Sequence, residues 1–318
     1  MVKFLARCPS FNTSGSYNKS SRDGDIRDEP QAALRGTVAS LPLKGKSALI
    51  TGAGRVLGVY ITQELAEVGA SCIAIIGRDK ARIDVAQKNF SDAYPSTEYT
   101  TFAADITDEQ TIVDVFKIFG APDVLVNNAG VFPDAGPFVE QSLAEWFSGF
   151  IINILGTATV AQKFLQAKWK FNPAIVLNVS SMAAHMRFPL IRWSGYNGSK
   201  MGQVRIFENI RFEHPEVRFV NVHPGNIESD GFTPSGASEP SGGMTDGKLV
   251  GQLFAWLASG EADFLSGRFV WAEWDIEELK AKEKSILEND LLLTTVDRFS
   301  KGFLWYTLYQ MTTCAVDC

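Results

Sequence analysis

Tyr196 and Lys200 lie four residues apart in the segment SGYNGSK, within a predicted helix over residues 195–211. Side chains at this spacing share one face of a helix. A tyrosine hydroxyl has a pKa near ~10 and is a poor acid–base group at neutral pH, but a neighbouring ammonium favours the phenolate and lowers that pKa. The pair is therefore suited to moving a proton to or from a substrate oxygen. Taken alone, the same spacing also fits an exposed helix pair without a chemical role.

Two further side chains fit such a proton transfer. Ser181 ends the apolar segment AIVLNVSS, 15 residues before Tyr196, and its hydroxyl suits the holding of a substrate carbonyl oxygen. Asn153 lies in FIINILG, within a predicted helix over residues 143–167, and suits the holding of a water that links Lys200 to solvent. The four residues together predict acid–base chemistry on a carbonyl or hydroxyl group.

A glycine-rich segment, TGAGRVLG, follows the first apolar run of the chain. We expect Gly52 to permit a tight turn and Gly58 to permit close packing of the following helix, whose first amides then meet a pyrophosphate. Val56 stands where a dinucleotide loop has its middle glycine. At a positive φ this valine would be strained by about 1 kcal/mol or more, and Gly54 is expected to relieve the strain by letting the loop take another path. We expect the loop to bind a dinucleotide all the same.

Short apolar runs alternate with helical patterns along the chain, which is typical of parallel βαβ units. The predicted fold is an α/β domain with a single doubly wound parallel sheet of the Rossmann type and helices on both faces. The expected strands are residues 48–50, 72–78, 100–107, 123–130, 174–181, 218–225 and 267–274. The expected helices, after one that ends at Gly69, are residues 81–90, 108–119, 143–167, 195–211, 247–259 and 275–290. Ligands bind such sheets at the carboxyl ends of the strands.

Small and polar residues follow these strands. Asp105, in AADIT, suits a hydrogen bond from an adenine amino group, and NNAG, residues 127–130, permits close approach of a cofactor. Pro224 and Gly225, in HPG, end a later strand and open a segment rich in Gly, Ser and Pro, which suits a lid over a binding site. These positions predict one site lined by consecutive strand ends.

The choice of dinucleotide depends on the second strand end, IIGRD. An acidic residue there would pair with the ribose hydroxyls of NAD. Here Arg78 holds that place, Arg55 lies in the glycine loop, and Asp79 comes one residue late, where we expect it to face solvent. Two guanidinium groups suit a 2′-phosphate. The sequence therefore favours NADP(H) over NAD(H).

Three regions are expected along the chain. Residues 1–43 are polar and read as an N-terminal tail or arm. Residues 44–285 form the dinucleotide-binding oxidoreductase domain, with a substrate lid near 226–247. Residues 286–318 form a C-terminal aromatic tail.

The composition narrows the classes of protein. The 318-residue chain has a net charge of −6, which argues against binding of nucleic acid. We find no uninterrupted apolar stretch of the length that a membrane span needs, and no convincing signal peptide. The four cysteines form no disulfide framework, and Cys314 and Cys318 lack neighbouring ligands for zinc, so no metal site is expected. A cytoplasmic location is the expectation.

These motifs, in their order, resemble the short-chain dehydrogenase/reductase family over roughly residues 45–274. The segment GRFVWAEWDIEELKAK resembles the C-terminal portion of filamentous-fungal members, many of which act in secondary metabolism. The resemblance implies that Tyr196 is the general acid/base, that Lys200 lowers its pKa and contacts the nicotinamide ribose, that Ser181 orients the substrate and that Asn153 supports a proton relay. It also implies a homodimer or homotetramer, formed through the helices that carry Asn153 and Tyr196.

The resemblance further implies the cofactor-binding residues. They are Gly52, Gly54, Arg55, Leu57, Gly58, Arg78, Asp105, Ile106, Asn127, Asn128, Ala129, Gly130, Tyr196, Lys200, Pro224, Gly225, Ile227 and Ser229. The chain departs from the family at Val56 and in the separation of Ser181 from Tyr196, which is about two residues longer. A longer loop, HMRFPLIRW, absorbs that difference, and Ser180 is the less suitable serine of its pair.

The expected function is an NADP(H)-dependent oxidoreductase that transfers a hydride between nicotinamide and a secondary alcohol or ketone of a small molecule. Phe188, Trp193, Phe232 and Met244 suggest a mostly apolar substrate, although they equally fit packing of the lid. The alternative is a catalytically silent protein of the same fold that senses NAD(P)H or acts as a scaffold. Val56 and the altered spacing support that alternative, whereas the retained Tyr196 and Lys200 oppose it.

Overall fold

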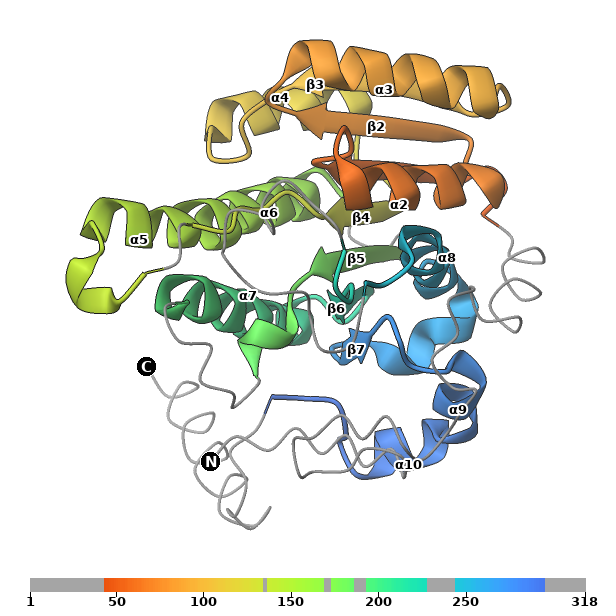
Figure 1. The fold of residues 1–318 in the computed structure, drawn as a ribbon. Helices are drawn as coiled ribbons and strands as arrows, with labels where there is room; N and C mark the ends of the chain where they lie inside the picture. The colour runs from red at the N-terminus through yellow and green to blue at the C-terminus, as the bar shows by residue number, and fades with distance from the viewer. Residues whose placement is uncertain (1–42, 134–135, 169–172, 186–192, 228–243, 295–318) are drawn as a thin grey trace, which may run out of the picture.

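The computed structural model describes residues 43–133, 136–168, 173–185, 193–227 and 244–294 (Figure 1). Within them, seven parallel strands form one sheet in the order β3-β2-β1-β4-β5-β6-β7. The strands are β1 Ser47–Thr51, β2 Cys72–Gly77, β3 Glu98–Ala103, β4 Val124–Asn127, β5 Ala174–Val179, β6 Val217–His223 and β7 Phe269–Trp271. The chain order reverses at β1, so β1 and β4 flank the topological switch point, where ligands of such sheets bind at the carboxyl ends of the strands.

The central strands are buried on both faces, which explains their unbroken apolar runs. In β2 the four residues 73–76 are fully buried. β3, at one edge of the sheet, alternates partly buried with exposed residues instead. The unbroken apolar runs of the sequence therefore correspond to the central, buried strands of the sheet.

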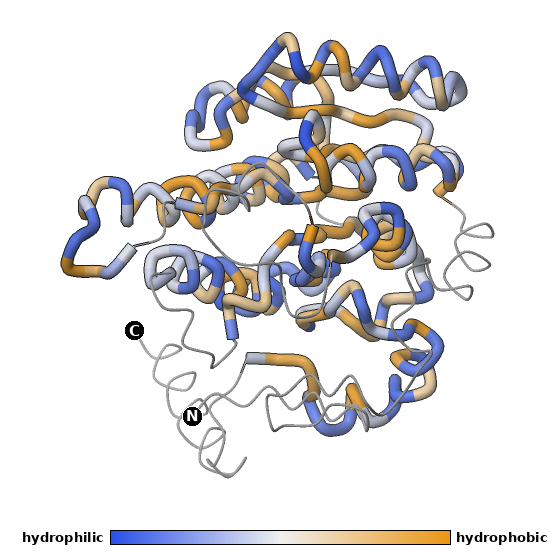
Figure 2. The backbone as a smooth tube through the Cα atoms, in the orientation of Figure 1, coloured by the Kyte–Doolittle hydropathy of each residue, from blue (hydrophilic) through white to orange (hydrophobic). Residues whose placement is uncertain are grey.

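Helices cover both faces of the sheet, as predicted (Figure 1). On one face lie α2 Val56–Glu67, α3 Lys80–Ala93 and α8 Gly247–Leu257, which pack on a core cluster that includes Trp256. On the other lie α4 Glu109–Phe119, α6 Thr157–Ala167 and α7 Ser194–Glu213, around a cluster that includes Phe164. Figure 2 shows apolar colour along the central strands and a mixture of polar and apolar residues along the helices around them. The doubly wound fold is confirmed.

The predicted helix over residues 143–167 contains a break in its regularity. α5, Leu143–Phe150, is followed by a π-helical segment, Ile151–Gly156, and then by α6. In the described part of the chain, Leu143–Ala167 is the one helix long and apolar enough to cross a membrane on length and composition alone. The helix packs on α4 and α7 within the fold.

The C-terminal part of the fold extends past the predicted boundary at residue 286. The predicted helix over 275–290 is split into α9, Ile276–Ala281, and α10, Glu283–Glu288. Beyond α10, Leu292 is buried, and its carbonyl accepts from the Phe269 N–H of the edge strand β7 at 2.8 Å. The segment thus covers an edge that would otherwise be open. Some of the predicted features lie outside the described residues. They are Ser229, Phe188, Phe232, most of the predicted arm and lid, and the tail from residue 295.

Candidate active site

The glycine loop between β1 and α2 turns tightly at Gly52, which has a φ of +71°. A Cβ on Gly58 would lie 2.4 Å from the Gly52 carbonyl oxygen, so only glycine lets α2 approach the loop this closely. No side chain caps the N-terminus of α2, whereas Asp79 caps α3 and Asp108 caps α4. The first amides of α2 are therefore available to an anion.

Val56 itself takes the unusual conformation in this loop. Its φ is +25°, in a region that side chains of L-residues rarely adopt. We expected Gly54 to relieve this strain, but that expectation is wrong, because the positive φ falls on Val56 and not on Gly54. Gly54 instead serves packing, since a Cβ there would lie 3.2 Å from Ile83 Cγ2 of α3. The left-handed conformation costs about 1–2 kcal/mol.

The polar residues predicted to read the adenosine end lie together at the ends of β2 and β3. Arg78 Nη1 lies 3.8 Å from Asp105 Oδ2, and the Arg78 side chain is 66% exposed. The other Asp105 oxygen accepts from Thr107 N and Oγ1, at 2.9 and 2.7 Å. Asp79 is exposed and accepts from the Arg82 N–H at the start of α3, so it acts as a helix cap. Arg55 is exposed in the loop.

The NNAG segment is held against the glycine loop by Thr51. The Thr51 hydroxyl oxygen accepts from the N–H groups of Asn128 and Ala129, at 3.0 and 2.9 Å. The Asn128 amide nitrogen donates to the Thr51 carbonyl at 2.8 Å. Asn127 is buried in the sheet, and a Cβ on Gly130 would lie 3.0 Å from Asn153 Oδ1. The sequence analysis did not identify Thr51. The signal available was a threonine hydroxyl at the end of a buried strand, where it can accept hydrogen bonds from the neighbouring NNAG segment.

Asn153 lies in the π-helical segment and is fully buried. Its Oδ1 accepts from Val131 N at 2.9 Å, and its Nδ2 donates to Val131 O and Ser199 Oγ, each at 3.0 Å. These bonds fix the chain after NNAG against α7. Both donors of the side-chain amide are used in this way, so any water it holds must bind the remaining lone pair of Oδ1.

Ser181 and Tyr196 come together at the carboxyl end of β5. Ser181 Oγ accepts from Ala183 N at 3.2 Å and also contacts the Tyr196 hydroxyl. Burial raises the pKa of Tyr196, and the contact with Ser181 partly offsets this. Ser180 is buried, and its N–H donates to Val222 O in the sheet.

Lys200 lies beside Tyr196, its Nζ 5.9 Å from the centre of the tyrosine ring. Burial lowers the pKa of Lys200 to about 8. Nζ donates to Val179 O at 2.9 Å and to Gln203 Oε1 at 3.3 Å. The predicted lowering of the Tyr196 pKa by Lys200 is not found in this arrangement, because desolvation of the hydroxyl dominates at that distance.

Aromatic rings enclose the tyrosine. The Phe132 ring lies 4.4 Å from that of Tyr196 and 4.9 Å, edge-on, from that of Trp193. Trp193 is thus near the site, as we expected, whereas Met244 is exposed. Sequence reasoning missed Phe132, because its place next to Tyr196 depends on the turn after NNAG.

The remaining predicted residues surround this centre. Gly225 turns with a φ of +80°, and a Cβ on it would meet Thr245 Oγ1 at 2.1 Å. Ile227 and Leu57 pack their side chains on the core, and Ile106 is buried against the π-helical segment. Leu57 and Ile227 are only partly buried, whereas Ile106 is buried.

Two histidines next to the site, the buried His223 and the partly buried His185, lie among aromatic rings. The His223 ring lies 4.7 Å from that of Trp271, and the His185 ring lies 4.7 Å from that of Phe269. Burial lowers the pKa of His185 to about 4 and, together with the charge of His185, that of His223 to about 3, against an ordinary value of 6.5. Both imidazoles are neutral at physiological pH and serve packing of β7.

We expect the free energy of unfolding to fall as the pH drops below 6.5, because the unfolded chain then binds protons that the folded chain does not. The loss should approach about 1.4 kcal/mol per pH unit for each histidine. Urea unfolding between pH 7.5 and 5 measures it. His223→Asn should reduce this slope, and His214→Asn, at the partly exposed third histidine, should not. Equal slopes in wild type and His223→Asn would contradict the assignment.

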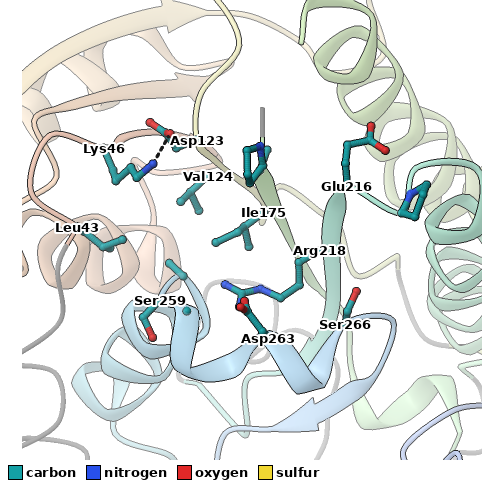
Figure 3. Close-up of a pocket in the computed structure, with 15 residues that line it drawn as sticks. Leu43, Lys46, Asp123, Val124, Ile175, Glu216, Arg218, Ser259, Asp263 and Ser266 are labelled. Carbon is teal, nitrogen blue, oxygen red and sulfur yellow. Dashed lines mark hydrogen bonds and ion pairs between the residues drawn. The ribbon is translucent and has the colours of Figure 1, made fainter. Parts of the chain in front are cut away.

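A hollow of about 420 Å³ opens at the other end of the sheet, at the start of β4, β5 and β6 (Figure 3). Among its lining residues, Lys46 pairs with Asp123 at 2.9 Å, and the buried Arg218 pairs with Asp263. The described residues that line it include none of those predicted for catalysis or cofactor binding. The chemistry gathers at the opposite, carboxyl-terminal ends of the strands.

Comparison with known proteins agrees with this geometry. The family model described as short chain dehydrogenase matches residues 46–240. The chain belongs to the short-chain dehydrogenase/reductase family. This dehydrogenase/reductase is accordingly an NAD(P)-dependent oxidoreductase.

Its relatives include fungal proteins. A short chain dehydrogenase/reductase of Aspergillus aculeatus, AacuD, is 32% identical over 255 residues, which cover 79% of this chain and 87% of the relative. One of Claviceps purpurea is 33% identical over 256 residues, covering 79% and 85%. Among solved structures, L-sorbose reductase of Gluconobacter frateurii, in complex with NADPH and L-sorbose, has a TM-score of 0.64 at 19% identity, with 72% of this chain and 95% of that one covered. The similarity to that structure shows the fold.

Proposed function

We propose that this dehydrogenase/reductase is NADP(H)-dependent and interconverts a secondary alcohol and a ketone of a mostly apolar small molecule. The observation that carries the proposal is the convergence of Ser181, Tyr196 and Lys200 at the carboxyl end of β5, with the tyrosine hydroxyl in contact with Ser181. A hydroxyl buried beside a cation, and next to a second hydroxyl, is suited to protonating a substrate oxygen.

The residues present fit a dinucleotide. Because Gly58 has no Cβ, its backbone can lie close to Gly52 in the loop. The first amides of α2 have no side-chain cap. Arg78 and Arg55 are exposed at the rim, as a 2′-phosphate requires. When bound, the nicotinamide supplies or accepts the hydride. Ser229, assigned to the cofactor by resemblance, lies outside the described residues.

The chain's own residues handle the proton. Ser181 orients the substrate oxygen, and Tyr196 gives it a proton in reduction or takes one in oxidation. Lys200 favours the phenolate electrostatically once a substrate brings the hydroxyl and the ammonium into one hydrogen-bonded arrangement. Asn153 holds the chain after NNAG and supports the relay that returns the proton.

The substrate class rests on the aromatic rings around Tyr196. Phe132 packs against the Tyr196 ring and Trp193 packs against Phe132, and apolar rings next to the tyrosine favour an apolar molecule. The fungal origin of the relatives is consistent with a role in secondary metabolism.

Consumption of NADPH in the presence of a panel of cyclic and aromatic ketones tests the proposal. We expect turnover with at least one apolar ketone and faster turnover with NADPH than with NADH. Binding of NADPH without turnover of any ketone or alcohol would favour the silent alternative, a sensor or scaffold. The positive φ of Val56 is the structural observation that supports the silent alternative.

Arg78→Ala should weaken binding of NADPH about tenfold to a hundredfold, because a charge-assisted hydrogen bond to the 2′-phosphate is lost. Its exposed pairing with Asp105 at 3.8 Å contributes little and does not hold the guanidinium away from a phosphate. Binding of NADH should be unchanged. Titration of each cofactor by fluorescence measures this. Lys88→Ala, which removes a cation farther along α3, is the control. An equal loss for both cofactors would contradict the role of Arg78.

We also propose a homo-oligomer built on α5 and the helix that follows it. Four apolar side chains at a spacing of four residues form an exposed stripe: Leu143 at 65%, Phe147 at 51%, Ile151 at 41% and Leu155 at 55% exposure. Such a continuous apolar face on a folded domain marks an interface. A second copy of this chain is the expected partner, by resemblance to the family.

Phe147→Glu is expected to shift the protein toward the monomer, because a carboxylate would be buried in the interface. Sedimentation equilibrium measures the shift. The matched control is Ile118→Glu, on α4, where the replaced side chain is 73% exposed. A wild-type monomer, or loss of the oligomer in the control as well, would refute the interface.

A further inference from the structure

Gln203 is a buried amide whose place beside Lys200 the proposed proton transfer leaves unexplained. It lies three residues after Lys200 on α7, so the two side chains share a face of the helix. Gln203 Oε1 lies 3.3 Å from Lys200 Nζ, and Gln203 is 1% exposed. A glutamine so deeply buried needs partners for both ends of its amide.

Thr157 supplies the second partner. Gln203 Nε2 donates to Thr157 Oγ1 at 3.2 Å, and Thr157 is buried at the start of α6. An ammonium can only donate, so the amide oxygen must face Lys200 and the amide nitrogen must face Thr157. The orientation of the amide is therefore fixed at the Lys200 end, and the Thr157 hydroxyl, which can donate or accept, accepts from the amide nitrogen.

The ammonium is held from two elements. Val179 O of β5 accepts from Nζ at 2.9 Å and Gln203 accepts from the other side, which leaves the third N–H of Lys200 for the Tyr196 side. Among the described residues, Tyr196 is the titratable side chain next to Lys200, with its ring centre 5.9 Å from Nζ. Because the site is desolvated, a neutral acceptor there stabilises the charged form strongly.

We propose that Gln203 is a positioning residue, which holds the Lys200 ammonium in its charged form beside Tyr196 while Thr157 accepts from the Gln203 amide nitrogen and anchors it. The expected effect on turnover rests on the proposed function. The contact between Gln203 and Lys200 does not depend on it. A buried glutamine that merely joined α7 to α6 would stabilise the fold without affecting the titration of Lys200.

The titration of Lys200 tests the contact directly. Protein labelled with ¹³C at the lysine ε carbon reports the charge of each lysine by NMR, and Lys200→Met assigns the signal. In the wild type we expect Lys200 to titrate near pH 8. Gln203→Met, of similar length but without the acceptor, should move this titration down by about one pH unit. Gln203→Glu, which keeps an acceptor, should move it up.

Turnover supplies the second readout. The alkaline limb of the kcat profile should move with the Lys200 titration, while KM for the ketone changes little. Thr157→Val should shift the titration in the same direction as Gln203→Met, and Thr157→Ser should behave as wild type, so a folding defect in one variant leaves the test intact. Gln162→Met, at a glutamine bonded to Lys163 on α6, is the control.

An unchanged Lys200 titration in both Gln203→Met and Thr157→Val would overturn the inference. Failure of the wild type to bind NADPH or to turn over any ketone would refute the proposed function instead, and the NMR titration would still decide whether Gln203 holds the ammonium.

Discussion

Replacing Tyr196 by phenylalanine is expected to lower kcat by about a thousandfold, the size of effect that a positioned general acid contributes. The variant keeps the ring, which packs 4.4 Å from the ring of Phe132, and loses only the hydroxyl that contacts Ser181. The fold and the binding of NADPH should therefore be unaffected. Initial rates with a ketone that the wild type reduces, together with NADPH binding, measure the two effects separately.

The matched control is Tyr94→Phe, at the end of α3 and away from the strand ends. It removes one hydroxyl and should leave kcat unchanged. Turnover by Tyr196→Phe at the wild-type rate would mean that another group supplies the proton. Loss of NADPH binding in the same variant would mean that the hydroxyl holds the cofactor and not the substrate.

Gly58→Ala is expected to destabilise the protein by about 1–3 kcal/mol, as overpacking at a closed site does. The new Cβ would lie 2.4 Å from the Gly52 carbonyl oxygen and 2.7 Å from Ala53 Cα, so backbone has to move. Because those atoms form the loop at the start of α2, the affinity for NADPH should fall as well, by at least about tenfold. Urea unfolding and NADPH titration measure the two losses.

Two other glycines calibrate this result. Gly54→Ala meets the Ile83 side chain at 3.2 Å, which can shift, so its effect should be smaller. Gly260→Ala meets nothing within 4 Å and should change stability by no more than about 0.5 kcal/mol. Equal effects of Gly58→Ala and Gly260→Ala would show that close packing of α2 is not what glycine provides in this loop.

The features that could be predicted from the sequence are those governed by local periodicity. The apolar runs of the strands and the helical patterns between them define the doubly wound sheet, and its topology brings the strand ends to one edge. The spacing of Tyr196 and Lys200 was sufficient to place both on one helix face, where the structure has them.

Features that depend on contacts between distant segments were not predictable. Thr51 binds the NNAG segment, and Phe132 packs on Tyr196. Gln203 contacts Lys200. Each of these contacts depends on how the helices and strands pack against one another. The direction of the Tyr196 pKa shift was also wrong, because the distance to Lys200 and the burial of the hydroxyl cannot be read from spacing. The sequence predicted strain at Val56 only if that position required a positive φ, and the structure meets this condition, because Gly54 does not relieve it.

The most direct test of the central claim, that the glycine loop binds a dinucleotide and prefers NADPH, is a thermal-shift titration with NADPH and NADH in parallel. A ligand at a hundred times its Kd stabilises the folded protein by about 2.7 kcal/mol, so affinity is read as a rise in Tm. We predict a rise with NADPH at concentrations at which NADH gives little. A larger rise with NADH would contradict the assignment of Arg78 and Arg55 to the 2′-phosphate. No rise with either cofactor would contradict the account of the loop and favour a catalytically silent protein.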